Sequence, residues 1–332
     1  MIVPQTVEKK IKNGTRAKKV RNIVLKIVGA IILAIVLFLA VVFTVDKISS
    51  RSEQKRIEQY GQQVSVDGKN MNVLIQGEGE ETVVLLPGYG TSAPALDFKA
   101  LIEELAPFYK VVVVEPFGYG LSDDTKKERN TANIVSEIHE ALQSLNIDRY
   151  ILMGHSIAGI YGLDYVNKYP DEVIAFAGID SSVPAQGGMD VEFPTGTFKF
   201  LKKSGLARLM LKASGDLYAE LPFDDETKKQ LNLITLKNLY NSSSMNEMEH
   251  IYSNFVAAQN LKFPENLPLI LFVQSNNENR KDWLSLHEEQ AKESRYGKVI
   301  PIEGSHYLHH TRSKEIAEAF KSYVEDIISK VK

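Results

Sequence analysis

The hydrophobic pattern begins with one long apolar run near the start of the chain. Residues 27–45 read IVGAIILAIVLFLAVVFTV, carry no charge and have Thr44 as their one polar side chain. As an α-helix these nineteen residues would extend about 28 Å at about 1.5 Å per residue, close to the thickness of a hydrocarbon core. The pattern predicts one N-terminal transmembrane helix.

The charges beside this run predict its orientation. Residues 1–26 hold eight basic residues and one acidic residue, and basic residues next to a membrane span stay in the cytoplasm. We therefore expect a basic cytoplasmic tail over 1–26, a helix crossing the cell membrane over 27–45, and everything beyond Asp46 outside. A cleaved signal peptide usually ends in small residues, whereas 41–46 read VVFTVD, which favours an uncleaved signal anchor. The polar stretch 46–62 indicates a juxtamembrane linker, with a short helix as the alternative.

From about Gln63 onward, short apolar runs alternate with amphipathic stretches. Runs rich in β-branched residues predict strands, and a period of 3.6 residues predicts helices. The expected strands are 64–66 and 73–75, which form a hairpin around Asp67-Gly68, then 82–86, 111–115, 150–153, 173–179, 269–273 and 298–302. The expected helices are 95–105, 131–145, 157–168, 283–292 and 314–330.

This alternation defines the expected fold class. The strands from Thr82 onward are almost continuously apolar, as parallel strands covered on both faces are. The pattern predicts an α/β fold with a doubly wound, mostly parallel sheet, built from residues 63–184 and 263–332. Residues 185–262 show helical periodicity without a clear strand, so we expect a helical cap over the carboxyl edge of the sheet. Ligands bind at that edge in open α/β sheets.

Composition narrows the classes of function. The chain has 332 residues, of which 44% are hydrophobic and 24% charged, as in globular proteins. It contains no cysteine, which excludes disulfides, thiol catalysis and cysteine-metal sites. Beyond residue 26 there are 31 basic and 41 acidic residues, a charge balance unsuited to nucleic acid. No phosphate-binding loop or metal-ligand spacing stands out, so we expect neither cofactor nor metal.

The stretch GHSIAG, residues 154–159, is the first candidate for chemistry. It follows the apolar strand 150–153 and precedes a helix that ends near Pro170. A strand, a tight turn and a helix are the context that the nucleophile elbow GxSxG requires, with small neighbours two residues from the serine. Ala158 replaces the last glycine and adds only a methyl group. Ser156 is therefore a candidate nucleophile, and the alternative is an ordinary N-cap serine.

A serine nucleophile needs a base, and His306 is the candidate. It lies in EGSHY, residues 303–307, just after the last expected strand, from where a loop can reach back along the carboxyl edge. His309 and His310 are rivals by proximity, but we expect both at the surface. His155 is expected to pack or form a hydrogen bond locally.

The glycine-containing turn LLPGYG, residues 85–90, follows the first parallel strand and offers backbone N–H groups. Two such donors suffice to stabilise the oxyanion of a tetrahedral intermediate. The N–H groups of Tyr89 and Ile157 are the candidates for this oxyanion hole. An ordinary turn after a strand is the alternative.

Together these motifs resemble the α/β-hydrolase fold superfamily, over about 64–331. The matching pieces, in the order that the family has them, are LPGYG at 86–90, PFGYGLSD at 116–123, GHSIAG at 154–159 and GSH at 304–306. The resemblance implies Ser156 as nucleophile, His306 as base, and Tyr89 with Ile157 as oxyanion donors. Pro87 departs from the histidine that is usual before the oxyanion glycine.

The triad acid has two candidates. The superfamily usually places it after the penultimate strand, where this chain reads QSNNE and offers Glu278, one residue beyond the expected place. Asp180 ends the strand 173–179, which follows the helix after Ser156, and consecutive parallel strands usually lie side by side. Some members of the superfamily use an acid there. We take Asp180 as the first candidate and Glu278 as the alternative; Asp180 could also simply cap the turn that follows it.

These features predict a membrane-anchored serine hydrolase. Dehalogenases and epoxide hydrolases of this fold attack through an aspartate, whereas position 156 is serine. A small-molecule acyl substrate, most simply a carboxylic ester, would react through an acyl-enzyme. The alternative is a hydrolase-fold binding or signalling protein with little or no turnover.

Overall fold

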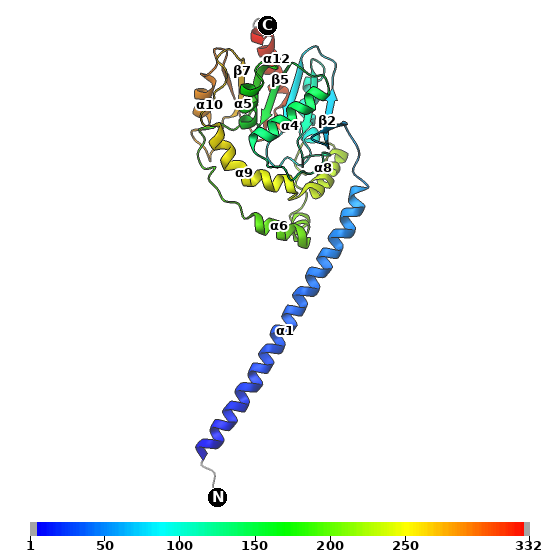
Figure 1. Ribbon diagram of the computed structural model, residues 1–332, viewed down its shortest axis with the longest axis vertical. Coiled ribbons are helices and arrows are strands. Elements are labelled where there is room, and N and C mark those ends of the chain that lie inside the picture. The colour runs from blue at the N-terminus through cyan, green and yellow to red at the C-terminus, as the bar shows by residue number, and fades with distance from the viewer. Residues whose placement is uncertain (1–4, 329–332) are drawn as a thin grey trace.

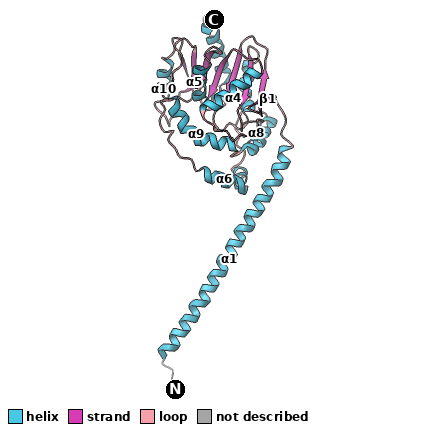
Figure 2. Ribbon diagram, in the orientation of Figure 1, coloured by secondary structure: helices cyan, strands magenta, loops and turns pink. Residues whose placement is uncertain are grey.

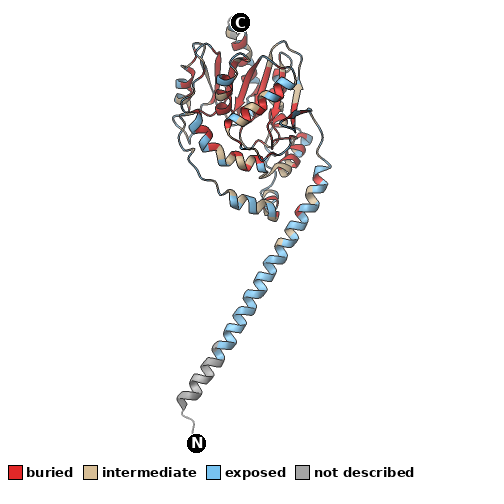
Figure 3. Cartoon of the chain, in the orientation of Figure 1, coloured by how far each residue is buried: buried red, intermediate tan, exposed pale blue. Residues whose placement is uncertain are grey.

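In the computed structural model, which describes residues 5–328, one long helix leads into an α/β domain (Figure 1). The helix, α1, runs from Gln5 to Gln54 without a break, so it continues through most of the stretch expected to be a linker. Its segment Lys18–Gln54 contains an 18-residue window with a mean hydropathy of 3.1, none of which is buried. Figure 3 shows the helix exposed except near the domain, where Asp46 and Glu53 are buried. By length and composition, α1 can cross a membrane.

An eight-stranded sheet forms the centre of the domain, in the order β1-β2-β4-β3-β5-β6-β7-β8. The first two strands form the expected antiparallel hairpin, β2 pairs with β4 antiparallel, and all later pairs are parallel. The bounds are β1 Gln62–Val66, β2 Lys69–Gln76, β3 Thr82–Leu86, β4 Lys110–Glu115, β5 Tyr150–His155, β6 Val173–Ile179, β7 Leu269–Gln274 and β8 Lys298–Ile302. The predicted fold class is confirmed.

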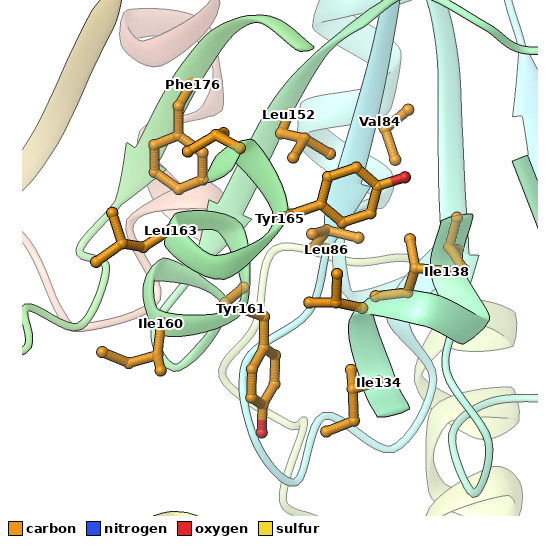
Figure 4. Packing of buried hydrophobic residues seen from close by; sticks show 14 of the residues in the cluster. Val84, Leu86, Ile134, Ile138, Leu152, Ile160, Tyr161, Leu163, Tyr165 and Phe176 are labelled. Atoms are coloured by element: carbon orange, nitrogen blue, oxygen red, sulfur yellow. The ribbon is translucent and has the colours of Figure 1, made fainter. Parts of the chain in front are cut away.

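Helices cover both faces of this sheet because successive strand residues point to opposite sides. In β3, Val84 and Leu86 pack on the face that carries α4 (Thr131–Ser144), α5 (Ala158–Lys168) and α10 (Trp283–Ala291), while Val83 and Leu85 pack on the other face. Figure 4 shows the first of these two layers, with side chains of α4 and α5 against the strands.

The second face is covered by shorter helices than the pattern predicted. The expected helix 95–105 is divided at Phe98 into α2 (Pro94–Asp97) and α3 (Lys99–Leu105). At the C-terminus, α11 (Leu308–Thr311) precedes α12 (Ser313–Tyr323), and a π-helical turn, η1, covers Val324–Ile328. The last two residues of the expected helix 314–330 lie outside the described residues, as do residues 1–4 of the expected basic tail.

Between β6 and β7 the described chain is helical (Figure 2). The helices are α6 Thr195–Ser204, α7 Leu206–Ala213, α8 Asp225–Asn238 and α9 Ser242–Ala258. They lie beside the edge at which the parallel strands end, between the sheet and the apolar part of α1 (Figure 1). The loops after β3, β5, β6, β7 and β8 converge at this edge.

Candidate active site

Ser156 occupies a tight turn between β5 and α5. Its φ angle is +54°, a left-handed conformation that few residues other than glycine adopt. A Cβ atom on Gly154 would lie 3.0 Å from the Cβ of Ala158, so this turn needs small residues on both sides of Ser156. Helix α5 has no side-chain cap. The serine hydroxyl instead points to a histidine, so the N-cap role weighed for Ser156 is not what the structure has.

His306, in the loop after β8, is that histidine. Its Nε2 lies 2.9 Å from Ser156 Oγ, and its Nδ1 lies 2.6 Å from Asp180 Oδ2. His155 is buried beneath it, with Nε2 3.1 Å from the carbonyl oxygen of His306, which is the local hydrogen bond expected of His155. The loop that carries His306 is thereby held over the turn that carries Ser156.

Asp180 lies at the end of β6 and is 1% exposed. Its Oδ1 accepts hydrogen bonds from the backbone N–H of Gln274, at 2.8 Å, and from Nε1–H of Trp283, at 2.6 Å. Its Oδ2 faces His306. Both oxygens of the carboxylate are therefore engaged, which fixes its orientation toward His306.

Glu278, the other candidate acid, is exposed in the loop between β7 and α10. It lines the mouth of the same pocket, but no hydrogen bond or ion pair joins it to another group in the described part of the chain. The residue that the structure brings to His306 Nδ1 is Asp180.

Sequence reasoning missed Gln274 and Trp283, which hold Asp180. Gln274 also bridges two loops, because its side-chain amide donates to the carbonyl of Gly304 at 2.7 Å. Trp283 is the only tryptophan of the chain and begins the expected helix 283–292. A tryptophan at the start of a helix near the carboxyl edge was a usable signal, since a buried indole N–H needs an acceptor.

The backbone N–H groups proposed for an oxyanion hole belong to residues that line the same pocket as Ser156. Tyr89 and Ile157 both border it. A Cβ atom on Gly88 would lie 2.7 Å from His155 Nδ1 and 3.0 Å from Ser156 Cβ, so only glycine lets this loop approach the serine so closely. The phenol of Tyr89 donates to the carbonyl of Ser244 at 3.0 Å, which ties the loop to α9.

The pocket above Ser156 has a volume of about 760 Å³. Its floor is formed by the core loops that carry Ser156 and His306. Its walls come from the segment after β6, from α9 and from the loop before α10. The lining combines apolar side chains (Met189, Ile251, Phe255) with amide side chains (Gln186, Asn276, Asn277). An organic acyl group of moderate size fits such a mixed lining.

His309 and His310 are not at the surface, so that prediction was wrong. Both are buried, and their Nε2 atoms lie 2.7 Å and 2.8 Å from the two carboxylate oxygens of Asp97, at the end of α2. Burial alone would raise the pKa of Asp97, yet the charges and hydrogen bonds of the two histidines lower it. Burial lowers the pKa of His309 and, far more, that of His155.

The atoms of Asp97, His309 and His310 that could bind a metal ion lie within 4.8 Å of one another. One carboxylate and two imidazoles are suitable ligands for several divalent metals. The Nε2 atom of each histidine already forms a hydrogen bond with a different oxygen of Asp97, however, while Nδ1 of His309 is buried without a hydrogen-bond partner in the described part of the chain. A metal ion would have to replace both hydrogen bonds.

A sequence profile of the alpha/beta hydrolase fold matches residues 81–296, and the chain belongs to that family. An uncharacterised protein of Bacillus subtilis strain 168, YbdG, is 29% identical over 301 residues, which make up 86% of this chain and 92% of that protein. Hydrolysis is the class of reaction that the family supports.

Solved structures with low sequence identity share the fold. The epoxide hydrolase VrEH1 from Vigna radiata has a TM-score of 0.62 and 17% identity, covering 80% of this chain and 97% of that chain. The enol-lactonase from Burkholderia xenovorans LB400 has a TM-score of 0.59 and 15% identity, covering 80% and 100%. In both, the part of the chain that is matched corresponds in extent to the domain without α1.

Proposed function

We propose that this protein is a serine hydrolase that cleaves carboxylic esters of small molecules through an acyl-enzyme. The observation that carries the proposal is the hydrogen-bonded series Ser156 Oγ, His306 and Asp180, which opens into a pocket of about 760 Å³. An aspartate in place of this serine would have favoured the chemistry of the epoxide hydrolases. A serine with a base and an oriented acid favours acyl transfer.

Acylation begins when Ser156 Oγ attacks the carbonyl carbon of the ester and His306 Nε2 takes the hydroxyl proton. Asp180 keeps the other ring nitrogen of His306 protonated and stabilises the positive charge that the ring acquires. The N–H groups of Tyr89 and Ile157 donate to the oxyanion. The intermediate collapses as the C–O bond breaks, and His306 gives its proton to the departing alkoxide, which leaves as an alcohol.

Deacylation repeats these steps with water as the nucleophile. Water attacks the acyl carbon and gives a proton to His306, and the ester bond to Ser156 then breaks. The proton returns to Ser156 Oγ, and the carboxylic acid leaves. The reaction is a balanced hydrolysis that needs no cofactor.

Residues 27–45 of α1 anchor this domain in our proposal, with the N-terminus in the cytoplasm and the hydrolase domain outside the cell. The supporting observations are the exposed apolar surface of the helix and the basic residues that precede it. Protease added to intact cells should remove the domain from the cell surface. Protection of the domain in intact cells, with digestion only after lysis, would contradict this orientation.

A fluorophosphonate probe tests the proposed chemistry on the full-length protein in detergent. Such probes phosphonylate a serine only when a neighbouring base activates it. We expect labelling of the wild type and no labelling of Ser156→Ala or His306→Ala, with Glu278→Gln labelled like the wild type. A folded wild type that is not labelled would favour the alternative, a binding or signalling protein with the hydrolase architecture.

A further inference from the structure

Helix α6 and helix α7 form the part of the domain nearest the apolar portion of α1 (Figure 1). No residue of α6 is buried, although half of its central positions are apolar. Phe200 is 55% exposed on α6, and Leu209 and Met210 are 44% and 58% exposed on α7. A helix pair in water would not normally leave such large side chains uncovered together.

The charges of the same two helices are all of one sign. Residues 195–213 contain five basic residues and no acidic residue, whereas the chain beyond residue 26 has more acidic than basic residues. On α6, Phe200 and Lys203 are three positions apart and share one side of the helix; on α7, Leu209 and Lys212 do the same. Apolar and basic side chains thus alternate over this pair of helices.

A set of ion pairs fixes α7 against α1. Arg208 donates to Asp46 at 2.7 Å and also to Ser50 and Glu53, and Lys212 donates to Glu53 at 2.8 Å. Arg208 is buried, so this contact is part of the packed interface between the two helices. The helix pair is therefore held at a fixed position along α1, beside residues 46–53.

That position along α1 corresponds to the surface of a membrane that α1 crosses. Asp46 is the first charged residue after the apolar run 27–45, and Glu53 lies two helical turns further on, about 10 Å at about 1.5 Å per residue. The polar headgroup layer of one leaflet is about 5–8 Å thick. A Cβ atom on Gly205, between α6 and α7, would lie 3.0 Å from the carbonyl oxygen of Val42, so the turn sits at the end of the apolar run.

A basic crevice lies between α6 and the helices above it. It has a volume of about 650 Å³, and its lining includes five lysines against two carboxylates: Lys126, Lys199, Lys202, Lys203 and Lys237 with Asp124 and Glu249. Burial lowers the pKa of Lys202 and of Lys237 through their loss of water, whereas Lys199 donates to Glu249 at 2.9 Å. An anion in the crevice would compensate for that loss.

We propose that α6 and α7 lie on the outer leaflet and bind anionic phospholipid headgroups, with Phe200, Leu209 and Met210 entering the interface and the lysines of α6 binding phosphate. The inference rests on the proposed membrane crossing of α1 and is independent of the hydrolase chemistry. Amphipathic helices with basic and large apolar side chains bind anionic bilayers in this way.

The absence of cysteine from the chain allows a direct test with single labels. The full-length protein would carry Phe200→Cys or Met210→Cys, each labelled with an environment-sensitive fluorophore. The matched control is Glu288→Cys on α10, an exposed position on a helix that lies on the other side of the domain from α1 (Figure 1). Each variant is reconstituted in nanodiscs of phosphatidylcholine, with or without about a third of phosphatidylglycerol, plus a lipid with a nitroxide on its headgroup.

We expect quenching at positions 200 and 210 to exceed that at 288 by at least about threefold in the anionic nanodiscs. Replacing Lys199, Lys202 and Lys203 with Gln should remove most of the difference between anionic and neutral lipid, as should raised salt. Equal quenching at all three positions would overturn the inference. Quenching that is unaffected by the lysine substitutions would overturn the assignment of these lysines to headgroup binding.

Two further measurements separate this inference from the membrane crossing on which it rests and from the hydrolase chemistry. Retention of the full-length chain in vesicles washed with alkaline carbonate reports the membrane crossing. Extraction of the chain would overturn both the crossing and the placement of α6 and α7 on the outer leaflet. The rate on a soluble aryl ester reports the hydrolase chemistry and should be the same within about twofold in the triple lysine variant. Retention in the vesicles without quenching at 200 and 210 would overturn the placement of α6 and α7 alone.

Discussion

Two clusters of histidine and aspartate lie side by side at the carboxyl edge of the sheet, and they differ in what surrounds them. In the first, Asp180 binds a single histidine, His306, whose side chain is 41% exposed and reaches Ser156. In the second, Asp97 binds His309 and His310, and all three residues are buried. The histidines of the two clusters are only three and four residues apart in sequence.

This difference shows why a histidine paired with a carboxylate does not by itself define an active site. The histidines of the second cluster are more deeply buried, and neither they nor Asp97 line the pocket above Ser156. In the first, Trp283 and a backbone N–H hold the aspartate by hydrogen bonds. The aspartate pairs with Nδ1 of His306, and the Nε2 atom of the same ring faces Ser156. Access to a cavity and a ring nitrogen that faces a serine make the first cluster suitable for chemistry.

The largest expected effect comes from His306→Gln. Removing the base should lower kcat for an aryl ester by about 10³- to 10⁵-fold, because Ser156 loses its proton acceptor. The free energy of unfolding should change little, since His306 is partly exposed. The matched variant His309→Gln should show the opposite result, with activity per folded molecule kept and stability lost. The same changes in kcat and in free energy of unfolding in the two variants would contradict this distinction between the clusters.

Asp180→Asn should come next, with a loss of about 10⁴-fold in kcat. An amide at this position cannot stabilise the imidazolium and can hold His306 in the wrong tautomer. Glu278→Gln is the control and should retain activity within about twofold, because Glu278 is exposed. Steady-state kinetics of both variants decide between the two acids. Full activity of Asp180→Asn with loss in Glu278→Gln would reverse our assignment.

Asp97→Ala should act on stability. Its removal leaves two buried histidines without their acceptor, so we expect the free energy of unfolding to fall by about 3–5 kcal/mol. Chemical denaturation of the detergent-solubilised protein measures this change. Fluorophosphonate labelling per folded molecule should remain close to that of the wild type. Loss of labelling without loss of stability would show that the second cluster takes part in catalysis.

Trp283→Phe should have a smaller effect on catalysis. The substitution keeps an aromatic ring and removes the hydrogen bond from Nε1 to the Asp180 carboxylate. Hydrogen bonds to charged groups contribute about 1.5–3 kcal/mol, so kcat should fall by about ten- to a hundredfold. Unchanged kcat in a folded variant would mean that the backbone N–H of Gln274 is sufficient to hold Asp180.

The smallest effect concerns the pH dependence of stability. Burial lowers the pKa of His309 below its value in the unfolded chain, so the unfolded state binds more protons as the pH falls below about 6.5. The free energy of unfolding should therefore decrease with acidification from pH 7 to pH 5. The slope should be shallower in His309→Gln. Equal slopes in the two proteins would assign the effect to other groups, such as His155.

Much of the fold could be predicted because parallel strands leave a clear pattern. The strands Thr82–Leu86, Val173–Ile179 and Lys298–Ile302 have the predicted bounds, since each is a short apolar run between turn residues. The break at Phe98 left no such mark, because α2 and α3 are both amphipathic. The position of a short break within a helix depends on how the helix packs against strands that are distant in sequence.

Site residues could be predicted where a reactive residue type stands in a motif at the end of a strand. They could not be predicted where their environment depends on partners distant in sequence. Ser156 and His306 each lie in a motif next to a strand end. The burial of His309 and His310 depends on Asp97, more than two hundred residues earlier in the chain, and no local pattern reports that contact. The choice between Asp180 and Glu278 likewise depended on where each loop turns after its strand.

The central claim is that the substrate's acyl group is transferred to Ser156. Mixing the full-length protein with an aryl ester should release the phenol in a burst equal to the amount of enzyme, and rapid acid quench followed by peptide mapping should find the acyl group on the peptide that carries Ser156. Ser156→Ala should show neither the burst nor the adduct. Turnover without a burst that persists in Ser156→Ala, or an adduct on another residue, would contradict the account.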